Sequence, residues 1–183
     1  WNAMPWVNTM AASADGRALY LDNSTVGNLS EEAISLWQER LASDPRTANL
    51  YAERGMVLLD GSDSRFAWVD VPGTPVPGTV PFEQRPRLER RDYIFNANDS
   101  YWLTQPAAPL TGYSPLYGPE ATARSLRTRM NVQLLDPDSP YGYAGDDGRF
   151  NRREIQEALF SNRSLAAELL KDALDEACRT TPA

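Results

Sequence analysis

The stretch from Arg91 to Trp102 constrains the fold of this chain most, because an apolar and aromatic run leads directly into two asparagines. The run Tyr93-Ile94-Phe95 is followed by Asn96 and Asn98. Asparagine is a poor strand residue and is common where a strand ends and the chain turns. We therefore expect a strand that ends in a turn. The amides of such a turn either satisfy local backbone groups or donate hydrogen bonds to a developing negative charge.

Charge and composition exclude several classes of function. The 183 residues are enough for one domain with a sizeable core. The formal net charge is −7, and charges of both signs are spread along the chain, so we expect no nucleic-acid partner. No apolar run approaches the roughly 20 residues that span a bilayer, so we expect no membrane partner either. The sequence has no histidine and one cysteine, which excludes a Ser-His-Asp triad or a Cys/His zinc site built from this chain alone.

The first part of the chain predicts strands and one helix. Residues 6–22 favour a β-hairpin around Asp15-Gly16, because glycine adopts positive φ without steric cost. Ser30 followed by two glutamates is typical of a helix start. Residues 55–70 favour a second hairpin around the turn 60–64. The aspartates of that turn lack the closing glutamate of an EF-hand loop, so they do not predict a calcium site.

The second part predicts helices. The basic stretch 85–91 is typical of a solvated face. Prolines impose a long irregular passage over 106–115, and residues 120–135 favour a helix. Asn151 and Ser164 each fit the start of a further helix. The prediction is an α+β chain, with residues 1–118 mainly strand and loop and residues 119–183 mainly helical.

Four residues are candidates for a site. Asn98 is a candidate donor to an oxyanion, and Arg124 offers a cation that can orient substrate or hold the asparagine. Trp6 and Val7 offer an apolar surface suited to an acyl chain. Each has a simpler interpretation. Asn98 fits a local turn, Arg124 fits an exposed arginine that solvates its helix, and Trp6 and Val7 fit the core of a hairpin.

Several pieces of the sequence resemble, in order, the penicillin acylase branch of the N-terminal nucleophile hydrolases. The likeness is closest to acylases that act on homoserine lactones and lipopeptides. The pieces are Met4–Thr9, Asn96–Leu103, Leu110–Pro115, Ala123–Arg129 and the tail Phe160–Ala166.

The resemblance implies a fold and an activity for a larger enzyme. The fold would be the four-layer αββα architecture, with residues 1–183 a single incomplete segment of the large (β) chain. The nucleophile would be an N-terminal serine on another segment, with its own α-amine as base. The expected partners are the α chain and the serine-bearing part of the β chain. The expected reaction is hydrolysis of the amide of an N-acyl substrate, fatty-acyl in preference to a β-lactam, in the periplasm or outside the cell. This segment alone would be inactive.

The resemblance also assigns roles to residues. Asn98 matches the oxyanion-hole asparagine of the family, with Asn96 the less favoured choice. Arg124 matches the family's arginine, with Arg127 as the alternative, and Trp6 and Val7 fall where the family has acyl-pocket residues. A calcium ligand of related enzymes has no convincing match after Asn98, so neither a metal nor another cofactor is expected.

Two other functions are compatible with the sequence. The chain fits a non-enzymatic β-rich module that uses its aromatic residues for packing or ligand stacking. It also fits a relative of the acylases that has lost activity.

Overall fold

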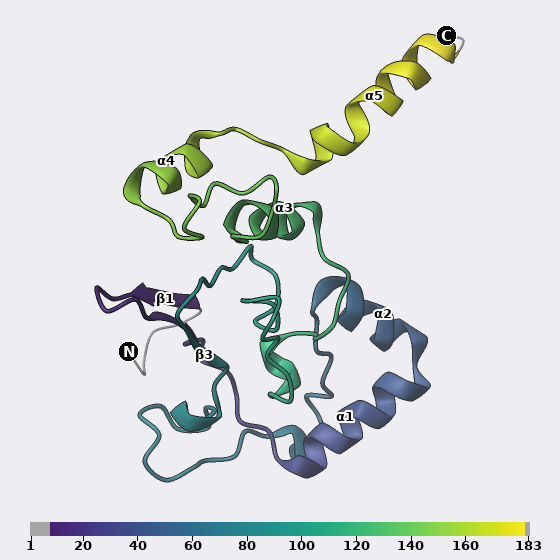
Figure 1. The fold of residues 1–183 in the computed structure, drawn as a ribbon. Coiled ribbons are helices and arrows are strands. Elements are labelled where there is room, and N and C mark those ends of the chain that lie inside the picture. Colours follow the sequence, from purple (N-terminus) through teal and green to yellow (C-terminus); the bar gives the residue numbers. More distant parts are fainter. Residues whose placement is uncertain (1–7, 182–183) are drawn as a thin grey trace. The chain divides into compact units, whose positions relative to one another are not determined.

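The computed structural model describes residues 8–181 (Figure 1), and these divide into two compact units, 8–122 and 123–181. Each unit is described by itself. The predicted acyl-pocket pair, Trp6 and Val7, lies outside the described residues, so its role stays a prediction. The described chain mixes helices with one antiparallel sheet, which agrees with the α+β prediction.

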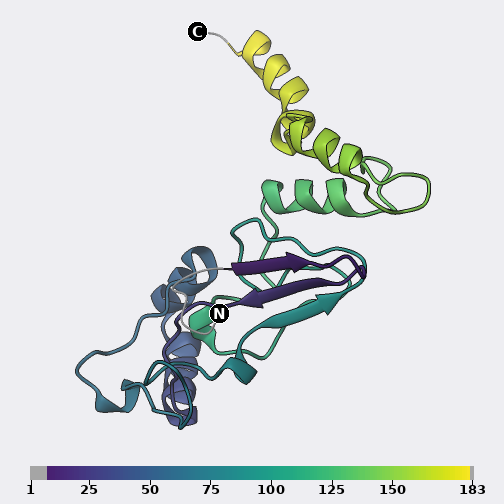
Figure 2. The same cartoon turned by 90° about the vertical axis from the view of Figure 1, so that its left-hand side faces the viewer.

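The first unit contains a three-stranded antiparallel sheet in the order β1-β2-β3. Figure 2 shows the three strands side by side. Strands β1 (Asn8–Ala12) and β2 (Ala18–Asp22) form the predicted hairpin, with Met10 opposite Tyr20. Gly16 in its turn has a φ of 79°, which a residue with a side chain adopts only with strain. The hairpin prediction is confirmed. The sequence could predict it because the turn residues and the strands that they join are neighbours in the chain.

The third strand lies within the basic stretch that was expected to form a solvated face. Strand β3 (Arg87–Arg90) pairs with β2, and Leu88 lies opposite Tyr20. Arg85, just before it, is only 2% exposed. Its guanidinium donates to Asn23 Oδ1 at 2.7 Å and to the Val80 carbonyl at 3.2 Å. The prediction of a solvated face is therefore wrong for Arg85. It holds for Arg87, Glu89 and Arg91, which are exposed although the segment pairs with a distant strand.

Two helices follow the hairpin. Helix α1 (Glu31–Ser43) begins as predicted, with the Ala33 N–H donating to Ser30 Oγ at 3.1 Å. Helix α2 (Pro45–Arg54) was not predicted, although Asp44 caps it, Pro45 opens it and a left-handed Gly55 ends it. The Trp37 and Tyr51 rings meet edge to face at 4.8 Å and join the two helices.

The second hairpin, expected over 55–70, does not form. The segment holds one short 3₁₀ helix, η1 (Ser64–Phe66). The Val69 N–H donates to the Asn28 carbonyl at 2.8 Å, and Asn28 Nδ2 donates to the Val69 carbonyl at 2.9 Å. A distant partner therefore satisfies the backbone that a hairpin would have paired locally.

The core of this unit lies beneath the sheet. It centres on Tyr20, Tyr101 and Leu110, with half-buried aliphatic and aromatic residues packed around them. Two further 3₁₀ turns, η2 (Phe82–Gln84) and η3 (Pro115–Tyr117), lie in its loops. The Tyr101 ring meets Tyr113 at 5.3 Å and Tyr117 at 6.0 Å, so the long passage after residue 101 folds back onto the sheet.

The second unit consists of α3 (Leu126–Leu135), α4 (Arg152–Phe160) and α5 (Leu165–Thr180). Helix α3 begins at Leu126 and not at residue 120, because Ser125 caps it by accepting from the Thr128 N–H at 3.1 Å. The predicted starts of α4 and α5 are confirmed by the capping box of Asn151 and the Ser164 cap. No helix between residues 8 and 181 is both long and apolar enough to cross a bilayer.

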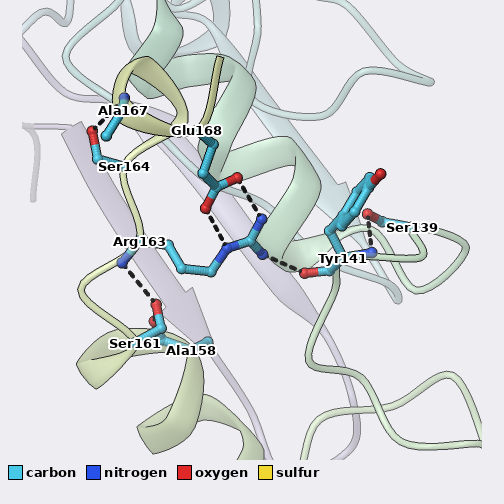
Figure 3. A network of polar contacts seen from close by, with 8 residues as sticks. All are labelled: Ser139, Tyr141, Ala158, Ser161, Arg163, Ser164, Ala167 and Glu168. Carbon is cyan, nitrogen blue, oxygen red and sulfur yellow. Dashed lines mark hydrogen bonds and ion pairs between the residues drawn. The ribbon is translucent and has the colours of Figure 1, made fainter. Parts of the chain in front are cut away.

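One arginine ties the loop after α3 to the junction of α4 and α5. Figure 3 shows the Arg163 guanidinium donating to both Glu168 carboxylate oxygens, at 2.8 and 2.9 Å. Its remaining nitrogen donates to the Tyr141 carbonyl at 2.8 Å. The guanidinium also lies 5.7 Å from the centre of the Tyr141 ring.

This pair should make the stability of the second unit depend on pH. The hydrogen bond from Arg163 holds the pKa of Glu168 below its ordinary 4.5. A lowered carboxylate pKa contributes stability that is present above 4.5 and lost as the pH falls through the folded value. We expect Glu168→Gln to lower the melting temperature at pH 7, with a difference from the wild type that shrinks below pH 4.5.

Circular dichroism melts of the chain between pH 7 and pH 3 measure this difference. The matched control is Glu157→Gln, which removes an exposed ion pair with Arg153 on α4 and should change little. A constant difference between wild type and Glu168→Gln at all pH values would contradict the prediction.

Candidate active site

The asparagine turn is the first part of the candidate site. The strand expected at 93–95 is absent; instead, the Phe95 N–H donates to the Thr104 carbonyl at 2.9 Å across a loop. Asn98 has a φ of 59°, in the left-handed region that asparagine tolerates better than most residues. The chain therefore reverses at Asn98 without a regular strand before it.

The two asparagines of this turn play different parts. The Asn96 carboxamide serves the local backbone, since its Oδ1 accepts from the Asn98 N–H at 2.8 Å and its Nδ2 donates to the Asp99 carbonyl at 3.4 Å. Asn98 is exposed to solvent. The simple interpretation of a local-turn amide thus describes Asn96, while the role of the exposed Asn98 stays a prediction.

A cleft of about 450 Å³ opens beside this turn. Its walls are Asn8, Asp22, residues 24–27, residues 99–101 and residues 116–117. Four segments that are separate in the sequence thus meet where the sheet ends. Asn98 itself does not line the cleft, but the three residues that follow it do.

Glu120 holds the cleft wall in place. Its Oε1 accepts a short hydrogen bond from the Tyr101 hydroxyl and a 2.8 Å bond from the Gly112 N–H. Trp102 Nε1 adds a 3.3 Å bond to Thr122 Oγ1. These bonds fix the irregular passage that follows residue 101.

The charged groups at the cleft are unevenly buried. Asp22 is 6% exposed, and burial raises the pKa of its carboxyl, although the Ser24 N–H donates to it at 3.0 Å. Burial also raises the pKa of the Tyr117 hydroxyl. Among the described residues, no group of three or more acidic, histidine or cysteine side chains is arranged to hold a metal ion.

Arg124 belongs to the second unit and Asn98 to the first, so each is described only within its own unit. Arg124 is exposed and precedes the Ser125 cap of α3. A cation at a helix N-terminus opposes the helix dipole. Stabilisation of α3 therefore does not explain why arginines stand at 124 and 127.

Comparison with known proteins decides the family. The sequence model of the penicillin amidase family matches residues 1–182. The chain belongs to the penicillin amidase family. An aculeacin-A acylase of Actinoplanes utahensis is 39% identical over 184 residues, which cover 98% of this chain and 22% of that protein. The acyl-homoserine lactone acylase PvdQ of Pseudomonas fluorescens (strain Pf0-1) is 39% identical over 168 residues, which cover 92% of this chain and 20% of that protein.

The chain thus spans about one fifth of the length of these penicillin amidase relatives. The family resemblance expected from the motifs is confirmed. Sequence reasoning missed Glu120 and the cleft residues Asp22, Ser100 and Tyr117. No local pattern marked them, because their positions depend on contacts between segments far apart in the chain.

Proposed function

We propose that this chain is part of an N-terminal nucleophile acylase that hydrolyses the amide of an N-acyl substrate. Asn98 supplies the side-chain donor of the oxyanion hole. The observation that carries the proposal is the position of Asn98, which is exposed in the left-handed conformation directly before the residues that line the cleft. Membership of a family whose relatives are named acylases supports the reaction class.

The reaction needs a group from another segment. A serine at a chain N-terminus, activated by its own α-amine, attacks the amide carbonyl and forms a tetrahedral intermediate. The Asn98 carboxamide N–H donates to the oxygen that becomes negative, together with a backbone N–H from elsewhere. Collapse expels the amine, and water then hydrolyses the acyl-enzyme. Arg124 orients the substrate or the asparagine, and Trp6 and Val7 contact the acyl chain.

The other segments of the same precursor are the proposed partners, and with them the chain completes the four-layer αββα fold. Exposed apolar side chains on α4 and α5 support this. Leu159 and Phe160 are each 72% exposed, and Leu174 is 64% exposed. Faces of this kind mark surfaces that other parts of a protein cover. We place the enzyme in the periplasm or outside the cell, and propose that it needs no cofactor.

The full-length protein that contains this chain should release both a free amine and a fatty acid from N-octanoyl-homoserine lactone. Fluorescamine labelling and chromatography of octanoate measure the two products. The 183-residue chain alone should release neither, because the proposed serine nucleophile lies on another segment. Intact-mass analysis should show a companion chain that begins with serine. Turnover by the isolated chain would contradict the proposal, and so would a full-length protein that hydrolyses no N-acyl amide.

A further inference from the structure

We propose that the cleft lined by Asp22, Asp99, Ser100 and Tyr117 binds the amine half of the N-acyl substrate, the part that leaves as a primary ammonium group. The inference rests on the proposed amide hydrolysis and adds which half of the substrate lies in the cleft next to Asn98. The cleft volume of about 450 Å³ is within the range of small-molecule sites.

The position of the cleft relative to Asn98 is the first argument. Asp99, Ser100 and Tyr101 line the cleft and follow Asn98 directly in the chain. Consecutive Cα atoms are about 3.8 Å apart, so the cleft wall begins one residue from the proposed oxyanion donor. An amide whose carbonyl oxygen meets Asn98 can therefore extend one of its two substituents into the cleft.

The charge of the lining selects between those substituents. Two carboxylates, Asp22 and Asp99, line the cleft, and none of the described lining residues is basic. The buried Arg85 guanidinium donates its hydrogen bonds to Asn23 and the Val80 carbonyl and does not line the cleft. Burial raises the pKa of the Asp22 carboxyl, and the charge of Arg85 partly offsets this rise. Opposite charges attract more strongly where solvent is partly excluded. The cleft therefore favours an ammonium group and disfavours a fatty acid carboxylate.

Two hydroxyls give the cleft hydrogen-bonding capacity that the described chain does not use. Ser100 Oγ and the Tyr117 hydroxyl are shielded from solvent and have no hydrogen-bond partner between residues 8 and 181. A buried hydroxyl without a partner is unfavourable, so a ligand that bonds to it gains affinity. An amine that carries carbonyl, lactone or hydroxyl oxygens offers such bonds, whereas an alkyl chain offers none.

Ligand-observed NMR on the full-length protein tests the inference with two probes, L-homoserine lactone as the amine and octanoate as the acid. We expect Ser100→Ala and Tyr117→Phe each to raise the dissociation constant of the amine about five-fold, the value of one hydrogen bond. Octanoate binding should not change. Asp99→Asn should also weaken amine binding and reduce its dependence on salt.

Thr104→Val is the matched control. Thr104 Oγ1 is also a buried hydroxyl without a partner among the described residues, but it does not line the cleft. This variant should bind both probes like the wild type. Failure of the wild type to bind the amine would overturn the inference, as would equal amine binding by all variants, or parallel loss of amine and octanoate.

The two proposals fail in different ways. In one outcome, the wild type binds the amine and the cleft variants bind it more weakly, but the wild type hydrolyses no N-octanoyl amide. This result would contradict the proposed function and support the amine site. In the other outcome, the protein hydrolyses the amide, but substitution of Ser100 or Tyr117 does not change its affinity for the amine. This result would overturn the inference and leave the proposed function intact.

Discussion

Asn98→Gly in the full-length enzyme is expected to lower kcat for N-acyl amide hydrolysis by about 100- to 1,000-fold, with KM little changed. The loss corresponds to about 3–4 kcal/mol of transition-state stabilisation, the usual effect of removing one oxyanion-hole donor. An interaction made only in the transition state lowers kcat and kcat/KM together. Glycine is chosen because Asn98 has a φ of 59°, which glycine adopts without strain. The backbone turn therefore survives while the amide is lost.

Asn162→Gly provides the matched control. Asn162 is also an exposed asparagine in the left-handed region, with a φ of 51°, but it lies in the second unit outside the candidate site. Its replacement should leave kcat unchanged. Asn98→Asp should be at least as inactive as Asn98→Gly, because a carboxylate repels the developing oxyanion. Steady-state kinetics of the three variants decides the matter, and an Asn98→Gly enzyme within ten-fold of the wild type would remove Asn98 from the mechanism.

Glu120→Ala is expected to destabilise the first unit by about 2–4 kcal/mol. It removes the acceptor of the Tyr101 hydroxyl, whose side chain is 2% exposed, and of the Gly112 N–H. An unsatisfied buried donor costs about 1–3 kcal/mol, and bonds to a carboxylate are among the stronger ones. The loop that carries the cleft wall should loosen, so amine affinity should fall with stability.

Urea denaturation of the chain, followed by tyrosine and tryptophan fluorescence, measures the change in the free energy of unfolding. Glu120→Gln keeps the accepting oxygen and should cost much less. In a double-mutant cycle, Tyr101→Phe should remove most of the additional cost of Glu120→Ala, because no buried hydroxyl is then left without a partner. Equal destabilisation by the alanine and glutamine variants would show that the hydrogen bonds of Glu120 are not what holds the loop.

Local signals predicted some elements correctly. The hairpin at Gly16, the Ser30 and Ser164 caps and the Asn151 capping box each depend on residues within one or two turns of one another. Helix α2 had an equally local signal, in Asp44, Pro45 and Gly55, and went unrecognised. Motif position favoured Asn98 over Asn96 as the oxyanion donor, and this assignment stays a prediction.

The sequence by itself determined the family, the absence of histidine chemistry from this chain and the candidate asparagine, because motifs, composition and caps are properties of neighbouring residues. Only the tertiary structure decided that the polar segment of β3 joins the sheet and that the apolar segment 55–70 does not. It alone brought Asp22, Ser100 and Tyr117 to one cleft. The physical reason is that strand pairing and buried polar contacts join residues far apart in the chain, and their free energies outweigh local propensity.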